Sequence, residues 1–207
     1  TMNLINNELE NPYTPGVYML TGVNGIGKST IVDSIAAVHP ETVALHASLE
    51  LRQLFNGISR EELEMLKPED KLAKMVVHFT TQFEKTLEEK KAVLLDTHLL
   101  VPIRKDRSVV YEDIWSDAYT PYLSSMVMLS AEPSDIRAWR LRDEANTGRK
   151  RNSEVLDITA DQDQNIARFR SLASNGSIPE GSKVINNNHG SIEATRKDIE
   201  EIFRTRS

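Results

Sequence analysis

The chain has 207 residues, 39% of them hydrophobic and 27% charged, which is an ordinary composition for one well-buried domain. Its formal net charge of −6 argues against a surface coated with positive charge for nucleic acid, and the absence of cysteine excludes disulfides and thiolate metal sites. No stretch has the pattern of a signal peptide or approaches the roughly 18 apolar residues of a membrane span, so we expect a cytoplasmic protein without a membrane partner.

Short apolar runs alternate with helical patterns along the chain. Five runs have the length and composition of buried parallel strands: 17–21, 42–47, 92–96, one within 122–131, and 183–187. Helices are expected at about 29–38, 49–55, 134–142, 161–173 and 191–204, and over 59–90 with a break or a new first turn at Pro68. Residues 143–158 are charged and are expected to be irregular. This alternation predicts an α/β fold, a three-layer sandwich with a five-stranded parallel sheet.

The segment after the first expected strand reads GVNGIGKS and fits the pattern G-x-x-x-x-G-K-[ST]. Its glycines let the loop curl so that backbone N–H groups converge on an anion, and the following helix directs its positive end there. Lys28 supplies charge for the β- and γ-phosphates, and Ser29 offers its hydroxyl to Mg²⁺. The motif predicts a P-loop NTPase fold that binds ATP through Gly22, Asn24, Gly25, Ile26, Gly27, Lys28, Ser29 and Thr30.

Polar residues follow two other expected strands, and ligands of parallel sheets lie at such strand ends. Asp96 closes the third strand, where its carboxylate can hold Mg²⁺ opposite Ser29; the alternative is an acid that simply ends a strand. His98 follows and can contact the acceptor or be structural. The end of the second strand offers further candidates for the acceptor: His46, Ser48 and Arg52.

A basic cluster lies at 135–154 in this otherwise acidic chain. Arginine makes planar contacts to phosphoryl oxygens, and phosphoryl transfer needs such charge at the transition state. We therefore expect Arg140, Arg149 and Arg151 to act in catalysis on a mobile lid that excludes water. Arg137 and Lys150 are expected on the surface, which is the usual place of a charge run.

Together these segments resemble the nucleoside monophosphate kinases, in particular the archaeal-type adenylate kinases, over nearly the whole chain. VYMLTGVNGIGKST (17–30) looks like their first strand and phosphate loop, AVLLDTH (92–98) is similar to their third strand, and RLRDEANTGRKRN (140–152) looks like their short lid. KVINNNHG (183–190) resembles the last strand and the loop that contacts adenine, which implies ATP contacts by Asn187 and His189. HASLELR (46–52) resembles the monophosphate site, which implies that Arg52 binds the acceptor phosphate.

The resemblance implies a single kinase domain over 1–207, with a helical acceptor-binding region at 48–90 and a lid at 143–158. The implied activity is phosphoryl transfer from ATP·Mg²⁺ to a nucleoside monophosphate, with Lys28, Ser29 and Asp96 serving ATP·Mg²⁺. Two departures bear on the acceptor. Glu64 lies in the helix where the family places a basic residue, and NTG (146–148) lengthens the lid.

These departures leave the acceptor open. One alternative is a P-loop kinase that acts on an RNA end or a coenzyme precursor, although the net charge of −6 disfavours RNA. Another is a nucleotide-binding regulatory ATPase, which needs no closing lid. We expect ATP and a small molecule as partners, and the oligomeric state does not follow from the sequence.

Overall fold

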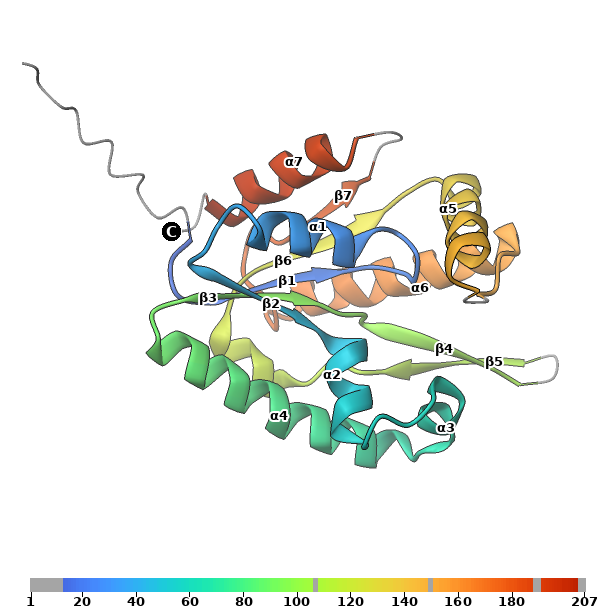
Figure 1. The fold of residues 1–207 in the computed structure, drawn as a ribbon, viewed down its shortest axis with the longest axis horizontal. Helices are drawn as coiled ribbons and strands as arrows, with labels where there is room; N and C mark the ends of the chain where they lie inside the picture. The colour runs from blue at the N-terminus through green and yellow to red at the C-terminus, as the bar shows by residue number, and fades with distance from the viewer. Residues whose placement is uncertain (1–12, 106–107, 149–150, 188–190, 205–207) are drawn as a thin grey trace, which may run out of the picture.

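The structure is a computed structural model that describes residues 13–105, 108–148, 151–187 and 191–204. Its centre is a five-stranded parallel sheet in the order β2-β3-β1-β6-β7 (Figure 1). The strands are β1 (Val17–Thr21), β2 (Thr42–His46), β3 (Ala92–Asp96), β6 (Leu123–Ser130) and β7 (Lys183–Asn186). The predicted α/β fold with a five-stranded parallel sheet is therefore confirmed.

Helices cover both faces of the sheet because its central strands are apolar on both faces. Tyr18 and Leu20 of β1 pack with α1 (Lys28–Ala36) and α7 (Ile192–Arg204) on one face. Val17 and Met19 pack with α4 (Pro68–Glu88) and α6 (Val155–Ser174) on the other (Figure 1). Two hydrophobic layers result, and they make the molecule a three-layer sandwich.

The register of the sheet brings the ends of three strands level. Asp96 at the end of β3 pairs with Leu20 of β1 on one side and with His46 of β2 on the other. Residues that follow β1 and β3 in the sequence therefore meet at the carboxyl edge of the sheet.

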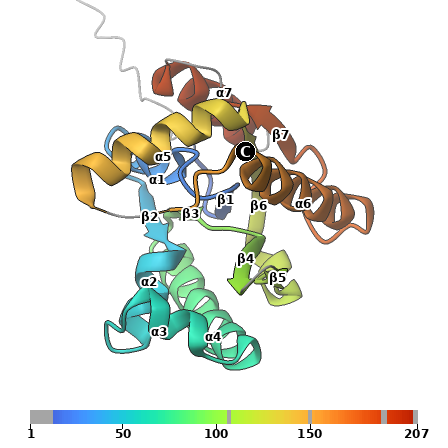
Figure 2. The same cartoon turned by 90° about the vertical axis from the view of Figure 1, so that its right-hand side faces the viewer.

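Two short helices precede α4: α2 (Ala47–Leu54) and α3 (Arg60–Met65). A capping box begins α3, in which Ser59 accepts from the N–H of Glu62 and Glu62 accepts from the N–H of Ser59. Pro68 begins α4 at a position where its missing N–H costs no helical bond. Figure 2 shows α2, α3 and α4 grouped together on one side of the sheet, away from α5.

The expectation that 143–158 is irregular was wrong at both ends. Helix α5 (Pro133–Thr147) continues to Thr147, and Gly148 ends it in the left-handed conformation with its N–H donated to Glu144 O. Helix α6 begins at Val155 rather than at 161. Glycine at the C-cap was the signal for the longer α5, and the described residues between the two helices are limited to 148 and 151–154.

One element lies outside every predicted strand. Strands β4 (Leu100–Lys105) and β5 (Ser108–Asp113) form an antiparallel hairpin that projects beyond the carboxyl ends of the central strands (Figure 1). A 3-10 helix, η1 (Asp117–Tyr122), follows it and leads into β6. Within the described ranges, no helix is both long and apolar enough to cross a membrane.

Candidate active site

The loop between β1 and α1 depends on its glycines for its shape. Gly22 has φ +145°, and a Cβ there would lie 2.9 Å from Leu129 O. Gly25 has φ +79°, and a Cβ there would lie 2.8 Å from Cγ of Arg140. A side chain would clash at both positions. Gly27, the second glycine that the motif fixes, has φ +97°, a backbone conformation that residues with a side chain rarely adopt.

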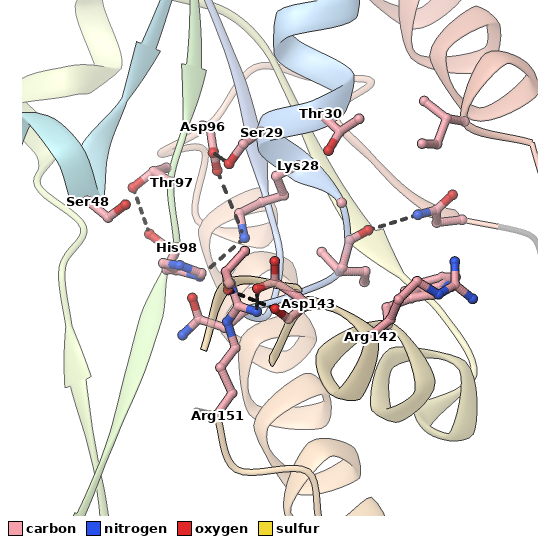
Figure 3. Close-up of a pocket in the computed structure, with 18 of the residues that line it drawn as sticks. Lys28, Ser29, Thr30, Ser48, Asp96, Thr97, His98, Arg142, Asp143 and Arg151 are labelled. Atoms are coloured by element: carbon pink, nitrogen blue, oxygen red, sulfur yellow. Dashed lines mark hydrogen bonds and ion pairs between the residues drawn. The ribbon is translucent and has the colours of Figure 1, made fainter. Parts of the chain in front are cut away.

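Lys28 begins α1 and returns its ammonium group to the loop. Its Nζ donates to Gly22 O at 2.9 Å and to Val23 O at 3.1 Å, and lies 3.9 Å from Oδ1 of Asp96. His98 approaches Lys28 from the end of β3 (Figure 3). Its Nδ1 lies 2.7 Å from Gly22 O. The Lys28 side chain is only 5% exposed. Water therefore screens its positive charge weakly, and the charge acts strongly on an anion bound at the loop.

Asp96 lies at the centre of a polar cluster. Ser29 Oγ donates a hydrogen bond to its Oδ2, and His46 donates to the same oxygen at 3.2 Å through Nδ1 while Nε2 lies 2.9 Å from Asp33 Oδ1. The bond to Asp96 raises the pKa of His46 to about 9, and Asp33 adds to this effect against the opposing effect of burial. Burial raises the pKa of Asp96, but His46, Lys28 and Ser29 together hold it below its ordinary value.

Ser29 and Asp96 fit a magnesium site by their chemistry. A hydroxyl and a carboxylate are hard oxygen ligands, and Mg²⁺ keeps several waters and needs few protein ligands. The direct hydrogen bond between the two side chains shows that they face the same point at the phosphate loop. The low pKa of Asp96 keeps the carboxylate ionised, as a metal ligand must be.

Two buried side chains that are distant in the sequence, Arg140 and Asn187, form hydrogen bonds to the backbone of the phosphate loop. Arg140 donates to Asn24 O through Nε at 3.0 Å and Nη2 at 2.8 Å, and through Nη1 to Asn152 O. Asn187 donates to Ile26 O at 2.8 Å and accepts from Thr195 Oγ1 at 2.7 Å. In the structure both residues therefore position the loop, and catalysis by Arg140 stays a prediction.

Of the predicted residues Arg149, Arg151 and His189, the structure describes only Arg151. Arg151 forms an ion pair with Asp143 through Nη1 (Figure 3). Its buried Nε has no hydrogen-bond partner among the residues that the structure describes, so a donor remains for a ligand. Arg149 and His189 lie outside the described residues, and their roles stay predictions.

A cavity of about 1040 Å³, here called the loop cavity, surrounds the phosphate loop. Loop residues 24–30 line one side of it, and one face of α5 lines another. That face consists of Trp139, Arg142, Asp143 and Thr147. The sequence analysis missed it because the spacing of these residues becomes a helical face only when α5 continues to Thr147.

A second cavity of about 940 Å³, here called the helical cavity, lies between α2, α3, α4 and the β4–β5 hairpin. All four predicted acceptor residues line it: His46, Ser48, Arg52 and His98. Arg52 is exposed and donates from Nε to Ile58 O at 3.4 Å. The side chain of Glu64 lies outside what the structure describes.

The two cavities share one wall. Asn24, Ser29, Ser48, Thr97 and His98 line both of them. Figure 3 shows Ser48, Thr97 and His98 on the side of the phosphate loop opposite to Arg142. His98, predicted as an acceptor residue, therefore lies at the boundary between the cavities.

A phosphate loop between β1 and α1, in a sheet of order β2-β3-β1-β6-β7 with helices on both faces, gives the chain the fold of the P-loop kinases. No family model matches the sequence, and no curated protein matches it in sequence. Solved structures are similar in fold at low identity.

Thymidylate kinase from Candida albicans is 12% identical with a TM-score of 0.59, and the similarity covers 93% of this chain and 92% of that one. Shikimate kinase from Bacteroides thetaiotaomicron is 13% identical with a TM-score of 0.54, over 90% of this chain and 97% of that one. At these identities the likeness shows the fold, and the activity must be argued from the site.

Proposed function

We propose that the protein transfers the γ-phosphoryl group of ATP to a nucleoside monophosphate. The main support is the meeting of the two cavities, one built around a phosphate loop and the other containing Arg52, with Ser29, Thr97 and His98 in both. Phosphoryl transfer between two bound substrates requires their reacting atoms at one place. A nucleotide-binding protein that only senses ATP needs no second cavity there.

On the donor side, the loop cavity would hold ATP with its phosphates at residues 22–29. Lys28 would contact the β- and γ-phosphates with a charge that is already fixed beside them. Ser29 and Asp96 would hold Mg²⁺, which neutralises charge on the transferred phosphoryl group when bound. Asn187 and Arg140 would keep the loop backbone in the shape that binds phosphate.

On the acceptor side, the helical cavity would hold the monophosphate with its phosphate toward Arg52. The guanidinium of Arg52 lies on α2, one turn from Ser48 at the shared wall. His98 would face the acceptor oxygen and the γ-phosphate together. Transfer would then be direct, by positioning and charge stabilisation, without a covalent protein intermediate.

The lid at 143–158 would complete the site when both substrates are bound. Arg151 and Arg149 would contact the phosphoryl group at the transition state, and closure would exclude water, which would otherwise accept it. Asp143 holds Arg151 at the loop cavity in the structure. This arrangement keeps one of the two arginines at the site before closure.

The test is to incubate the protein with ATP, Mg²⁺ and each of AMP, CMP, GMP, UMP and dTMP, and to measure the nucleoside diphosphates. We expect diphosphate formation that a Lys28→Ala variant lacks. Absence of any diphosphate above this control would refute the proposal. Release of ADP at one rate with and without acceptor would instead favour a regulatory ATPase.

A further inference from the structure

A buried ion pair lies in the wall of the helical cavity. Lys71 in the first turn of α4 places Nζ 2.6 Å from Oε2 of Glu112 on β5. Their side chains are 7% and 9% exposed, and both line the cavity. Neither residue belongs to the phosphate loop, the lid or the Arg52 segment, so the proposed transfer reaction leaves them without a role.

Packing alone does not explain this pair. Removing two charges from water costs free energy that their mutual attraction often fails to return, and apolar residues of similar size would pack at least as well. The Lys71 ammonium and the Glu112 carboxylate can each form further hydrogen bonds. Among the described residues, the ammonium of Lys71 donates only to Glu112, and the carboxylate of Glu112 accepts only from Lys71. Donors and acceptors therefore remain for a molecule in the cavity.

The surroundings of the pair fit a flat apolar body. Eight apolar side chains line the same cavity: Ala47, Leu49, Leu51, Leu63, Met75, Val101, Ile103 and Ile114. A polyol would leave its hydroxyl groups unpaired against such walls, which is costly. A nucleobase places apolar faces against them and presents its hydrogen-bonding groups at one edge. A cavity of about 940 Å³ has room for a whole nucleotide.

The hairpin that carries Glu112 is held in place from outside the cavity. Arg104 on β4 forms an ion pair with Asp161 of α6 at 2.6 Å, and the Tyr111 hydroxyl donates to the same oxygen at 3.0 Å. Asn165 of α6 bonds both the N–H and the carbonyl of Leu100. The carboxylate of Glu112 is thus fixed before a ligand binds, and such preorganisation favours selective recognition.

We propose that Lys71 and Glu112 recognise the base of the acceptor nucleotide and select guanine. Lys71 would donate to the O6 carbonyl, and Glu112 would accept from N1–H and the N2 amino group. Guanine fills all three bonds, whereas adenine offers this pair one acceptor and one donor group. A site built to bond a given edge rejects a base that lacks it, since buried polar groups are then left unpaired.

This inference rests on the proposed function for its substrate class, and base selectivity tests it. The first measurement is the ratio of kcat/KM for GMP to kcat/KM for AMP. The second is the binding of GMP and of AMP, measured by calorimetry without ATP. We expect the native chain to favour GMP. Glu112→Gln should lower the ratio roughly tenfold or more, because the amide replaces one acceptor with a donor. The glutamine carbonyl can then accept from only one of the two guanine donors, and without a charge.

Two further variants separate recognition from folding. Lys71→Met with Glu112→Leu replaces the pair by apolar side chains, which should keep the melting temperature and bring the ratio close to one. Lys91→Met with Glu89→Gln removes an exposed pair at the end of α4 and should leave the ratio as in the native chain.

Each outcome has one meaning. Diphosphate formation with a GMP to AMP ratio that none of these variants changes would overturn the role of the pair while leaving the transfer reaction intact. Binding of GMP that Glu112→Gln weakens, without any diphosphate formation, would keep base recognition and refute the transfer. No binding of GMP by the native chain would overturn the inference directly.

Discussion

The two cavities are built in different ways. The phosphate loop of the loop cavity comes from eight consecutive residues, and Arg140 and Asn187 hold it through its backbone carbonyls. The helical cavity is assembled from α2, α3, α4, β4 and β5, and its chemistry is carried by side chains such as Arg52, Lys71 and Glu112. Backbone geometry suits a ligand part that all members of a fold bind, whereas side chains can change with the acceptor.

The largest effect is expected at Lys28, in the loop cavity. Lys28→Ala removes the ammonium group at the phosphates and should lower kcat roughly a thousandfold, as loss of a preorganised charge does. Diphosphate formation in the steady state measures this loss. Lys91→Ala, an exposed lysine, is the matched control and should retain the native rate. Comparable rates for the two variants would contradict a phosphate-binding role for the loop.

The next effect is expected at Arg151, which lies between the loop cavity and the lid. Arg151→Ala should lower kcat roughly a hundredfold with a smaller change in KM for ATP, because its contact would form mainly in the transition state. Arg137→Ala removes an exposed arginine of α5 and serves as the control. If Arg151→Ala raised KM alone, Arg151 would be a ground-state binder.

A smaller effect is expected at Arg52, in the helical cavity. Arg52→Ala should raise KM for the acceptor about tenfold through loss of a charge-assisted hydrogen bond, while KM for ATP stays close to its native value. Initial rates over a grid of both substrate concentrations separate the two constants. Arg170→Ala, on the exposed side of α6, is the control. An equal rise in KM for the acceptor and in KM for ATP would contradict the assignment of one substrate to each cavity.

The smallest effect is expected in the support of the loop. Asn187→Ala removes the bonds to Ile26 O and Thr195 Oγ1, and it should lower the free energy of unfolding by about 1 kcal/mol per lost bond. Urea unfolding measures this change, and KM for ATP should rise with it. Native stability combined with native KM would show that Asn187 does not hold the loop.

The loop cavity was predictable from the sequence to a greater extent than the helical cavity. The phosphate loop and Asp96 follow from local signals, a motif of eight residues and an acid at a strand end, and the parallel sheet then brings them together. Lys71 and Glu112 lie 41 residues apart on a helix and on an unpredicted hairpin, so no local pattern relates them. The available signal for that hairpin was a pair of short runs that contain β-branched and aromatic residues, LVPIRK and SVVYED, on either side of the polar residues 106–107.

Arg140 shows a second kind of limit. Its place in a basic cluster predicts a catalytic arginine, but the direction of a side chain depends on tertiary packing. In the fold its guanidinium is directed to Asn24 O and Asn152 O. Arg142 was given no role, although it faces the loop cavity. The charge of the segment was predictable, and the face on which each arginine lies was not.

The central claim is that one substrate occupies each cavity and that the two meet at Ser29, Thr97 and His98. The most direct measurement is the binding of a dinucleoside polyphosphate that joins adenosine to guanosine through a chain of phosphates. We predict that one such molecule per chain displaces ATP and GMP together, because it spans both cavities. Displacement of ATP alone, with GMP still bound, would contradict the account.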